Sequence, residues 1–311
     1  MRDRTQKRLA QVTRLLSGRL TLAQHRELLV ITGWLTALLG CIHYDLGERE
    51  EAETSRRAAY EMGHQVGHGE LMGWAHEMSA WFALVEGRYE DVVTAARMGQ
   101  AVASQSSAQV QLTLQEARGL ARIGDRREAD KALTRGADVL AKLPLPGSPD
   151  HHFVFDHAKW IFYAATAYTW LEDNDRAEEH ARETIQMHTR PDGTSNALMR
   201  VADAHIDLGI IHARRGDLDA AVEQGMTAFN IDRRSLTDLV NRAADLDRVI
   251  RQRYRREALA EEFHERYVTA RRALAPAALS SSIDCSEQLP VAPVEHVRIV
   301  SLRTEPRMMR H

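Results

Sequence analysis

The densest group of metal-ligand residue types in the sequence is the segment Asp150–His157 (DHHFVFDH), which holds three histidines and two aspartates. Imidazole and carboxylate groups are the usual protein ligands of zinc and iron. The segment follows a proline-rich stretch, so its first two histidines lie on a predicted loop rather than on one helix face. We therefore expect a surface loop in which Asp150 caps a helix that begins near His152, with no metal and no other cofactor.

No constellation in the sequence pairs a nucleophile with a base. The phosphate-binding GxxxxGK[ST] loop, the GxSxG elbow, the GxGxxG fingerprint and the CxxC redox motif are all missing. Cys41 lies in an apolar run, where a thiol is usually inert filler. We therefore predict a protein without catalytic residues. A metal-dependent enzyme built on Asp150–His157 is the alternative, and metal analysis would test it.

Composition and charge narrow the class of protein. The 311 residues are 44% hydrophobic and 27% charged, and the net charge of −3 gives no electrostatic footprint for nucleic acid. We expect no direct binding to DNA or RNA. The two cysteines lie far apart, which suggests a reduced, cytoplasmic chain, and the charged N-terminus shows no signal peptide.

Two stretches allow a second interpretation. Residues 28–44 lack acids, lysine and arginine and could be mistaken for a membrane span, but two glycines, two threonines and a histidine favour a buried helix. The five arginines between Arg248 and Arg256 could contact phosphate, but flanking acids favour ion pairs on a helix surface. We therefore expect no membrane contact and no phosphate contact.

A short sequence motif is repeated along most of the chain. In each copy a helix-like run ends in a small loop, usually with glycine, and a charged pair then leads into alanine or valine. The copies end at residues 52, 92, 129, 177 and 221. Intervals of 40, 37, 48 and 44 residues are typical of stacked helical repeats, and strand patterns are almost missing. The predicted fold class is all-α, an α-solenoid of antiparallel helix pairs. Thr21 is predicted to cap a long helix through Leu46.

Breaks in the pattern indicate the domain boundaries. A proline-rich loop at residues 143–152 separates the third and fourth units and fits the 48-residue interval there. After residue 274 the composition turns to proline and serine without helical periodicity. The predicted organisation is an N-terminal helix at 1–20, five repeats at 21–233, capping helices at 234–275 and a disordered tail at 276–311.

Small residues recur at fixed positions of the units. Position eight is Gly40, Ala80, Ala117, Ala165 and Gly209; position twenty is Ala52, Val92, Ala129, Ala177 and Ala221; position twenty-seven is Ala59, Gly99, Gly136, Thr184 and Ala228. This register resembles the tetratricopeptide (TPR) repeat, in which small residues let two antiparallel helices approach closely. The chain departs from the family in the aromatic near position eleven, which survives only as Tyr168, and in the missing terminal proline.

At a finer level the chain resembles the C-terminal sensor region of actinobacterial helix-turn-helix transcriptional regulators. The resemblance rests on residues 33–60, 73–96 and 204–225. It implies a module that senses a peptide, a small molecule or a protein partner. Residues 1–20 provide one helix rather than the several that a DNA-binding domain of this kind needs, so we expect that domain to be absent from the chain.

The resemblance also implies where a ligand would bind, because the first helix of each TPR unit lines the concave groove. An aromatic ring supplies buried area there, and a neighbouring cation supplies a charge-assisted hydrogen bond. Packing against the next unit is the alternative role for the tryptophans, and solvation or ion pairing is the alternative for the cations. The predicted groove residues are Trp34, Trp74, Glu77, Trp81, Arg118, Lys159 and Phe162.

The predicted function is a non-enzymatic regulatory or sensor module. It binds a peptide or protein segment in its concave groove and is linked to transcriptional regulation. The alternative is a receptor for a small-molecule signal, with Trp74, Trp81 and Phe162 as apolar walls. Self-association into a homodimer through the exposed edges of the terminal repeats is a further expectation.

Overall fold

The chain folds into helices joined by short turns. The computed structural model describes residues 1–147, 151–231 and 237–274. Within these residues there is no strand, apart from an isolated bridge between Thr189 and Ser195, and the predicted all-α fold is confirmed. The helices are α1 (Arg2–Leu16), α2 (Leu22–Asp45), α3 (Arg49–Val66), α4 (Gly69–Val85), α5 (Tyr89–Val102), α6 (Ser107–Ile123), α7 (Arg126–Leu140), α8 (His157–Trp170), α9 (Asn174–His188), α10 (Leu198–Arg215), α11 (Leu218–Asn230), α12 (Thr237–Arg253) and α13 (Ala258–Leu274). The predicted tail at 276–311 lies outside the described residues.

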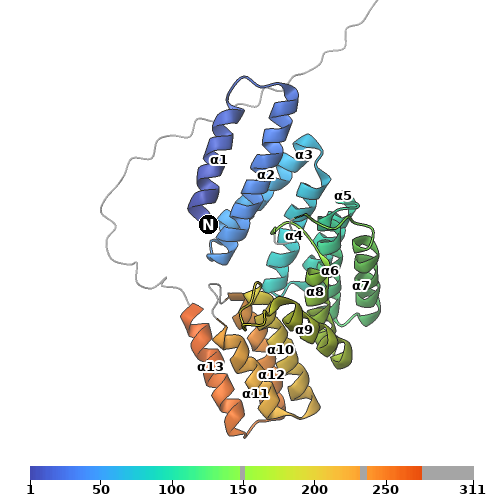
Figure 1. Ribbon diagram of the computed structural model, residues 1–311, viewed down its shortest axis with the longest axis vertical. Coiled ribbons are helices and arrows are strands. Elements are labelled where there is room, and N and C mark those ends of the chain that lie inside the picture. Colours follow the sequence, from blue (N-terminus) through green and yellow to red (C-terminus); the bar gives the residue numbers. More distant parts are fainter. Residues whose placement is uncertain (148–150, 232–236, 275–311) are drawn as a thin grey trace, which may run out of the picture. The chain divides into compact units, whose positions relative to one another are not determined.

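Helices pair along the chain in a solenoid-like order (Figure 1). From α2 onward each even-numbered helix packs against the odd-numbered helix that follows it, up to α12 and α13. The even-numbered helices also pack on one another in sequence, from α2 to α12. We call the surface that these six helices share the inner face. Helix α1 precedes the pairs and packs along α2.

The repeated motif of the sequence ends one helix and begins the next. Gly124 ends α6 with a φ of 89°, and the side chain of Asp125 then accepts the backbone N–H of Glu128 at 3.1 Å and caps α7. In the fourth unit Glu172 takes the place of the glycine and has a φ of 59°. This left-handed conformation costs a non-glycine residue about 1–2 kcal/mol. The turn geometry is therefore kept even where the residue type is not.

The small residues at the repeat positions let neighbouring helices approach closely, as predicted. A Cβ atom on Gly40 would lie 2.6 Å from the Met78 Cε atom, and one on Gly209 would lie 2.9 Å from the Leu246 Cδ2 atom. The alanines at the same position, Ala80, Ala117 and Ala165, have no exposed surface. Close helix contact at this position is therefore a shared property of the units.

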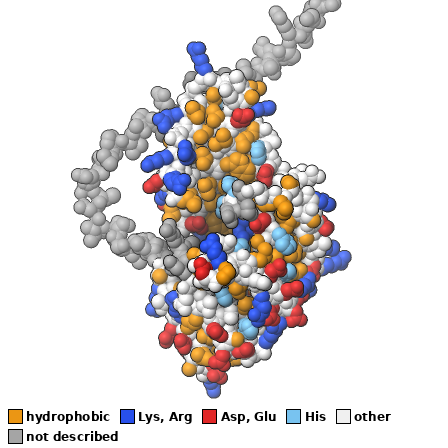
Figure 2. Space-filling model, viewed as in Figure 1, with side chains coloured by type: hydrophobic (Ala, Val, Ile, Leu, Met, Phe, Trp, Pro, Cys, Tyr) orange, Lys and Arg blue, Asp and Glu red, His pale blue; other side chains and the backbone are white. Residues whose placement is uncertain are grey.

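Helix α2 divides into an exposed first half and a buried second half. The side chain of Thr21 accepts the N–H of Gln24 at 3.2 Å, which confirms the predicted N-cap. Among the described residues, α2 is the helix long and apolar enough to cross a membrane, but Ala37, Cys41 and Tyr44 are buried in its second half. Apolar side chains gather along the α1–α2 hairpin (Figure 2), where Leu15 and Leu22 are largely exposed.

Candidate binding surface on the inner face

Every predicted groove residue lies on an even-numbered helix, but the structure places them in different surroundings. Trp34 is on α2, Trp74, Glu77 and Trp81 are on α4, Arg118 is on α6, and Lys159 and Phe162 are on α8. Trp81 packs on Tyr44 of the neighbouring unit, with ring centroids 4.5 Å apart. This is the alternative role given above for the tryptophans, packing between units. Phe162 is buried and packs edge-on against Tyr163 at 5.1 Å.

Trp34 and Trp74 are brought together by a residue of the chain's own loop. Phe153, in the segment that leads from α7 to α8, lies 4.9 Å from the Trp34 ring and 5.3 Å from the Trp74 ring. The Phe153 side chain is only 6% exposed. His152 packs edge-on against the same phenyl ring at 4.8 Å. The two tryptophans therefore hold an aromatic side chain that is inserted from outside the helix pairs.

The backbone of the segment His151–Phe155 is held by polar groups of α6 and α8. The Lys159 ammonium donates to the carbonyl oxygens of His151 at 3.2 Å, of His152 at 3.5 Å, and of Val154. The Phe155 N–H donates to the Ser107 hydroxyl at 3.1 Å. Lys159 was predicted to meet a ligand, and in the structure its ammonium holds this segment of the same chain.

The helix that follows this segment starts later than predicted. Asp156, rather than Asp150, is the cap, and its carboxylate accepts the N–H of Lys159 at 2.9 Å. The helix begins at His157 rather than near His152 because residues 151–154 form a turn, in which the Val154 N–H donates to the His151 carbonyl at 3.1 Å, and the contacts above hold this segment. Asp150 lies outside the described residues. Among the residues that the structure describes, no group of three or more His, Cys, Asp or Glu side chains is placed to bind a metal.

A buried polar chain continues from α4 to α6 and α8. The Glu77 carboxylate accepts hydrogen bonds from the side-chain amides of Gln111 and Gln115, each at 2.8 Å, and Gln111 also donates to the Tyr163 hydroxyl at 2.8 Å. Burial raises the pKa of Glu77, although the two amides oppose that shift. Glu77 is thus a carboxyl group that its surroundings push toward the neutral form.

Arg118 lies at the end of this polar chain, between two aromatic rings. Its guanidinium carbon is 4.9 Å from the Tyr163 centroid and 5.2 Å from the Trp170 centroid, within cation–π range. It donates one hydrogen bond, to the Gln115 side-chain oxygen at 3.3 Å, and its Nε atom has no partner among the described residues. Burial lowers the pKa of Arg118. Arg118 is therefore a desolvated cation with unused hydrogen-bond donors.

The second half of the inner face is closed by a charge cluster centred on the buried Asp245 of α12. The Asp245 carboxylate accepts from both terminal nitrogens of Arg122, at 3.1 and 2.5 Å, from Arg248 at 2.8 Å, from Arg242 at 3.5 Å and from the Trp170 indole at 3.1 Å. Burial raises the pKa of Asp245, but Arg122 and Arg242 outweigh it and bring the pKa down to about 2. We call these five side chains the Asp245 hub.

Arg242 extends the hub to the neighbouring helices. It pairs with Asp207 of α10, whose other carboxylate oxygen accepts the Thr166 hydroxyl of α8 at 3.2 Å. Asp207 has no exposed surface, and Arg242 is 4% exposed. The hub therefore joins four inner-face helices, α6, α8, α10 and α12.

Neither Phe153 nor most of the hub is predicted by the sequence patterns, for different reasons. Phe153 lies in a loop, where helical periodicity carries no information. Gln115 and Arg122, like Tyr163 and Trp170, are spaced seven residues apart and therefore share one face of their helix, as Trp74 and Trp81 do. That spacing could have indicated these inner-face residues of α6 and α8. No sequence pattern indicates that α6 contacts α12.

Comparison with known proteins supports the fold. No family model and no curated protein matches the sequence. The crystal structure of BtubC (BKLC) from P. vanneervenii is similar, with a TM-score of 0.51 and 13% sequence identity, over 75% of this chain and 94% of that chain. At this identity the likeness shows a shared helical fold and nothing about activity.

Proposed function

We propose that the protein is a TPR-like regulatory module that binds a peptide or protein segment on its inner face. The observation that carries the proposal is the segment His151–Phe155, which lies on that face as a peptide would. Its Phe153 side chain fills the space between Trp34 and Trp74, and Lys159 and Ser107 hold its backbone. An aromatic anchor in a pocket, with its backbone hydrogen-bonded, is a common way to bind a peptide.

The wider setting of the proposal comes from the sequence resemblance. By that resemblance the chain acts as a cytoplasmic sensor region of a transcriptional regulator. Exchange of one bound segment for another on the inner face would be the sensing event. Binding would require the chain's own segment to leave, because Phe153 is already packed between the two rings. The affinity for a partner is then reduced by the free energy of releasing that segment.

The test uses a variant that lacks the phenyl ring between the two tryptophans. Phe153→Ala removes the phenyl ring and leaves Trp34 and Trp74 in place. A labelled peptide with the sequence of residues 151–156, HHFVFD, should bind this variant at millimolar concentrations. This is the effective concentration that a short tether gives to the chain's own segment. The same peptide should bind the wild-type protein more weakly. Fluorescence anisotropy with an HHAVFD peptide as control measures this directly.

A second variant separates the inner face from other surfaces. In Trp34→Ala/Phe153→Ala one wall of the site is lost, so binding of HHFVFD should disappear. Equal binding by the single and double variants would contradict the proposal. Binding of indole or toluene by Phe153→Ala, without any binding of the peptide, would favour the small-molecule receptor instead.

A further inference from the structure

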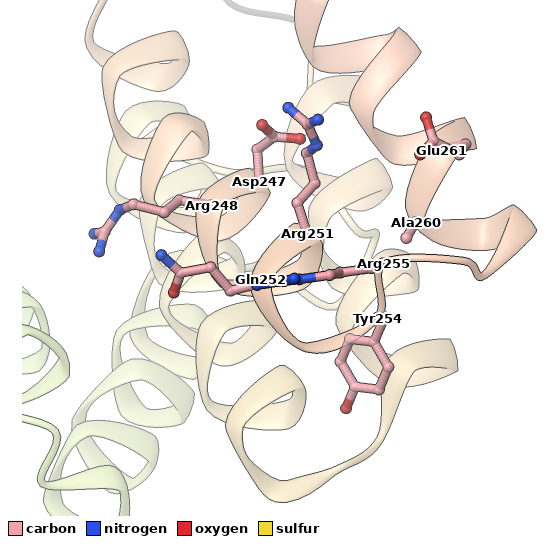
Figure 3. A pocket seen from close by; sticks show the side chains of 8 residues that line it. All are labelled: Asp247, Arg248, Arg251, Gln252, Tyr254, Arg255, Ala260 and Glu261. Carbon is pink, nitrogen blue, oxygen red and sulfur yellow. The ribbon is translucent and has the colours of Figure 1, made fainter.

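A cavity away from the proposed peptide site opens between α12 and α13. Its volume is about 540 Å³, within the range of small-molecule sites. Figure 3 shows the side chains that line it, and three of them are arginines, two on α12 and one in the turn that follows it. These are Arg248, Arg251 and Arg255. None of the residues around this cavity contributes to the segment His151–Phe155 or its contacts.

Among the described residues, Arg248 forms the ion pair that its acidic neighbours predicted, whereas Arg251 and Arg255 do not. Arg248 is neutralised by Asp245 at 2.8 Å. Arg251 and Arg255 have no carboxylate within 4.0 Å in the part of the chain that the structure describes, and both are exposed. Asp247, which lies one turn before Arg251 and also lines the cavity, accepts instead from the His264 ring at 2.9 Å.

Arg251 and Arg255 therefore present two uncompensated guanidinium groups to one cavity. Arg251 lies in the last turn of α12 and Arg255 in the turn that follows it, so the negative end of the helix dipole offsets part of the repulsion between these two like charges. Two guanidinium groups carry ten N–H donors and two positive charges, which match the oxygens and the double charge of a phosphate monoester. Gln252 also lines the cavity.

We propose that this cavity binds the phosphate group of a small phosphorylated molecule, through Arg251 and Arg255. Tyr254 holds the turn after α12 in place, because its hydroxyl donates to the Ala213 carbonyl at 2.9 Å. The Glu261 carboxylate stands on the α13 wall of the cavity and repels an anion. A ligand that also carries an amine would turn this repulsion into an attraction.

The chain offers a matched control for the test. Arg253 and Arg256 belong to the same run but do not line the cavity. Isothermal titration calorimetry of the full chain at constant ionic strength would use inorganic phosphate, phenyl phosphate and phosphoethanolamine. Arg251→Gln/Arg255→Gln should weaken phosphate binding by at least about tenfold, since hydrogen bonds to charged groups are the strong ones. Arg253→Gln/Arg256→Gln, with the same change in net charge, should weaken it by less than about threefold.

Three further results decide the proposal. Glu261→Gln should tighten the binding of inorganic phosphate and should remove any preference for phosphoethanolamine. Equal losses in the two double variants would show diffuse attraction to a basic surface and would overturn the site. Failure of the wild-type protein to bind any of the three probes saturably would also overturn it, whatever the result of the peptide experiments.

Discussion

The two halves of the inner face are closed by opposite kinds of interaction. Over α2 and α4 the closing contact is apolar: one phenyl ring, Phe153, between Trp34 and Trp74. Over α6 to α12 it is ionic: Asp245 and Asp207 with three arginines and an indole. An apolar contact has weak directional demands and can be exchanged for another ring. A buried ion cluster has exact partners, and losing one leaves the others charged and unsolvated.

The two halves of the inner face differ in whether their occupant can be exchanged. The aromatic half is covered by a loop that can leave if water replaces its carbonyl oxygens as acceptors for the Lys159 ammonium. The charged half is locked, since Arg122 of α6 pairs with Asp245 of α12 and Arg242 of α12 pairs with Asp207 of α10. If a partner reorganises the inner face, we expect it to act on the aromatic half and to leave the hub intact.

The largest effect is expected from removing the centre of the hub. Asp245→Ala leaves Arg122 and Arg242 buried without their shared acid and should lower the free energy of unfolding by about 3–5 kcal/mol. Urea denaturation followed by circular dichroism measures it. Asp175→Asn is the control, because Asp175 is 95% exposed in its pair with Arg215 and should change stability by less than about 0.5 kcal/mol. Equal losses in the free energy of unfolding for the two variants would contradict this prediction.

A smaller loss is expected from the aromatic half. Phe153→Ala should cost about 2–3 kcal/mol, below the 3–5 typical of phenylalanine in a rigid core, because a loop can partly collapse into the space. Tryptophan emission should shift to the red as Trp34 and Trp74 meet water. Leu145→Ala, in the same connection but 95% exposed, should change neither stability nor emission.

The hub should also be sensitive to acid. The pKa of Asp245 is lowered to about 2 in the folded protein from an ordinary value of 3.8, so the stabilisation is present above about pH 4 and is lost as the pH falls toward 2. The shift corresponds to about 2 kcal/mol. Unfolding free energies measured from pH 5 to pH 2 should fall more steeply for the wild type than for Asp245→Asn. Parallel curves would contradict this assignment.

The smallest effect, and one of opposite sign, is expected at Glu77. Because its pKa is raised by burial, the folded state binds its proton more tightly than the unfolded chain does. The wild type should therefore gain stability relative to Glu77→Gln as the pH falls from neutrality toward the ordinary value of 4.5. At pH 7 the substitution should change the free energy of unfolding by less than about 1 kcal/mol, since the amide replaces a poorly solvated charge. A large loss at pH 7 would mean that the Glu77 charge itself is needed.

Local properties of the chain could be predicted from the sequence, and long-range ones could not. The helix pairs, the cap at Thr21 and the close contact at Gly40 follow from the spacing of small residues and from capping chemistry, which act over a few residues. The position of Arg118 on an inner-face helix follows from the same register. Its aromatic neighbours depend on how α6 and α8 pack, and the site of Phe153 depends on the path of a loop, which periodicity does not encode.

The hub also bears on how the chain folds. A solenoid whose units contact only their neighbours can start folding anywhere and fray from either end. The contact between Arg122 and Asp245 joins residues 123 positions apart, so it closes a long loop that the nearest-neighbour contacts do not. Unravelling α12 and α13 therefore also breaks contacts made by α6 and α8. Hydrogen exchange at the C-terminal helices should consequently follow that of the middle of the array, as one cooperative unit, while the α1–α2 hairpin opens independently.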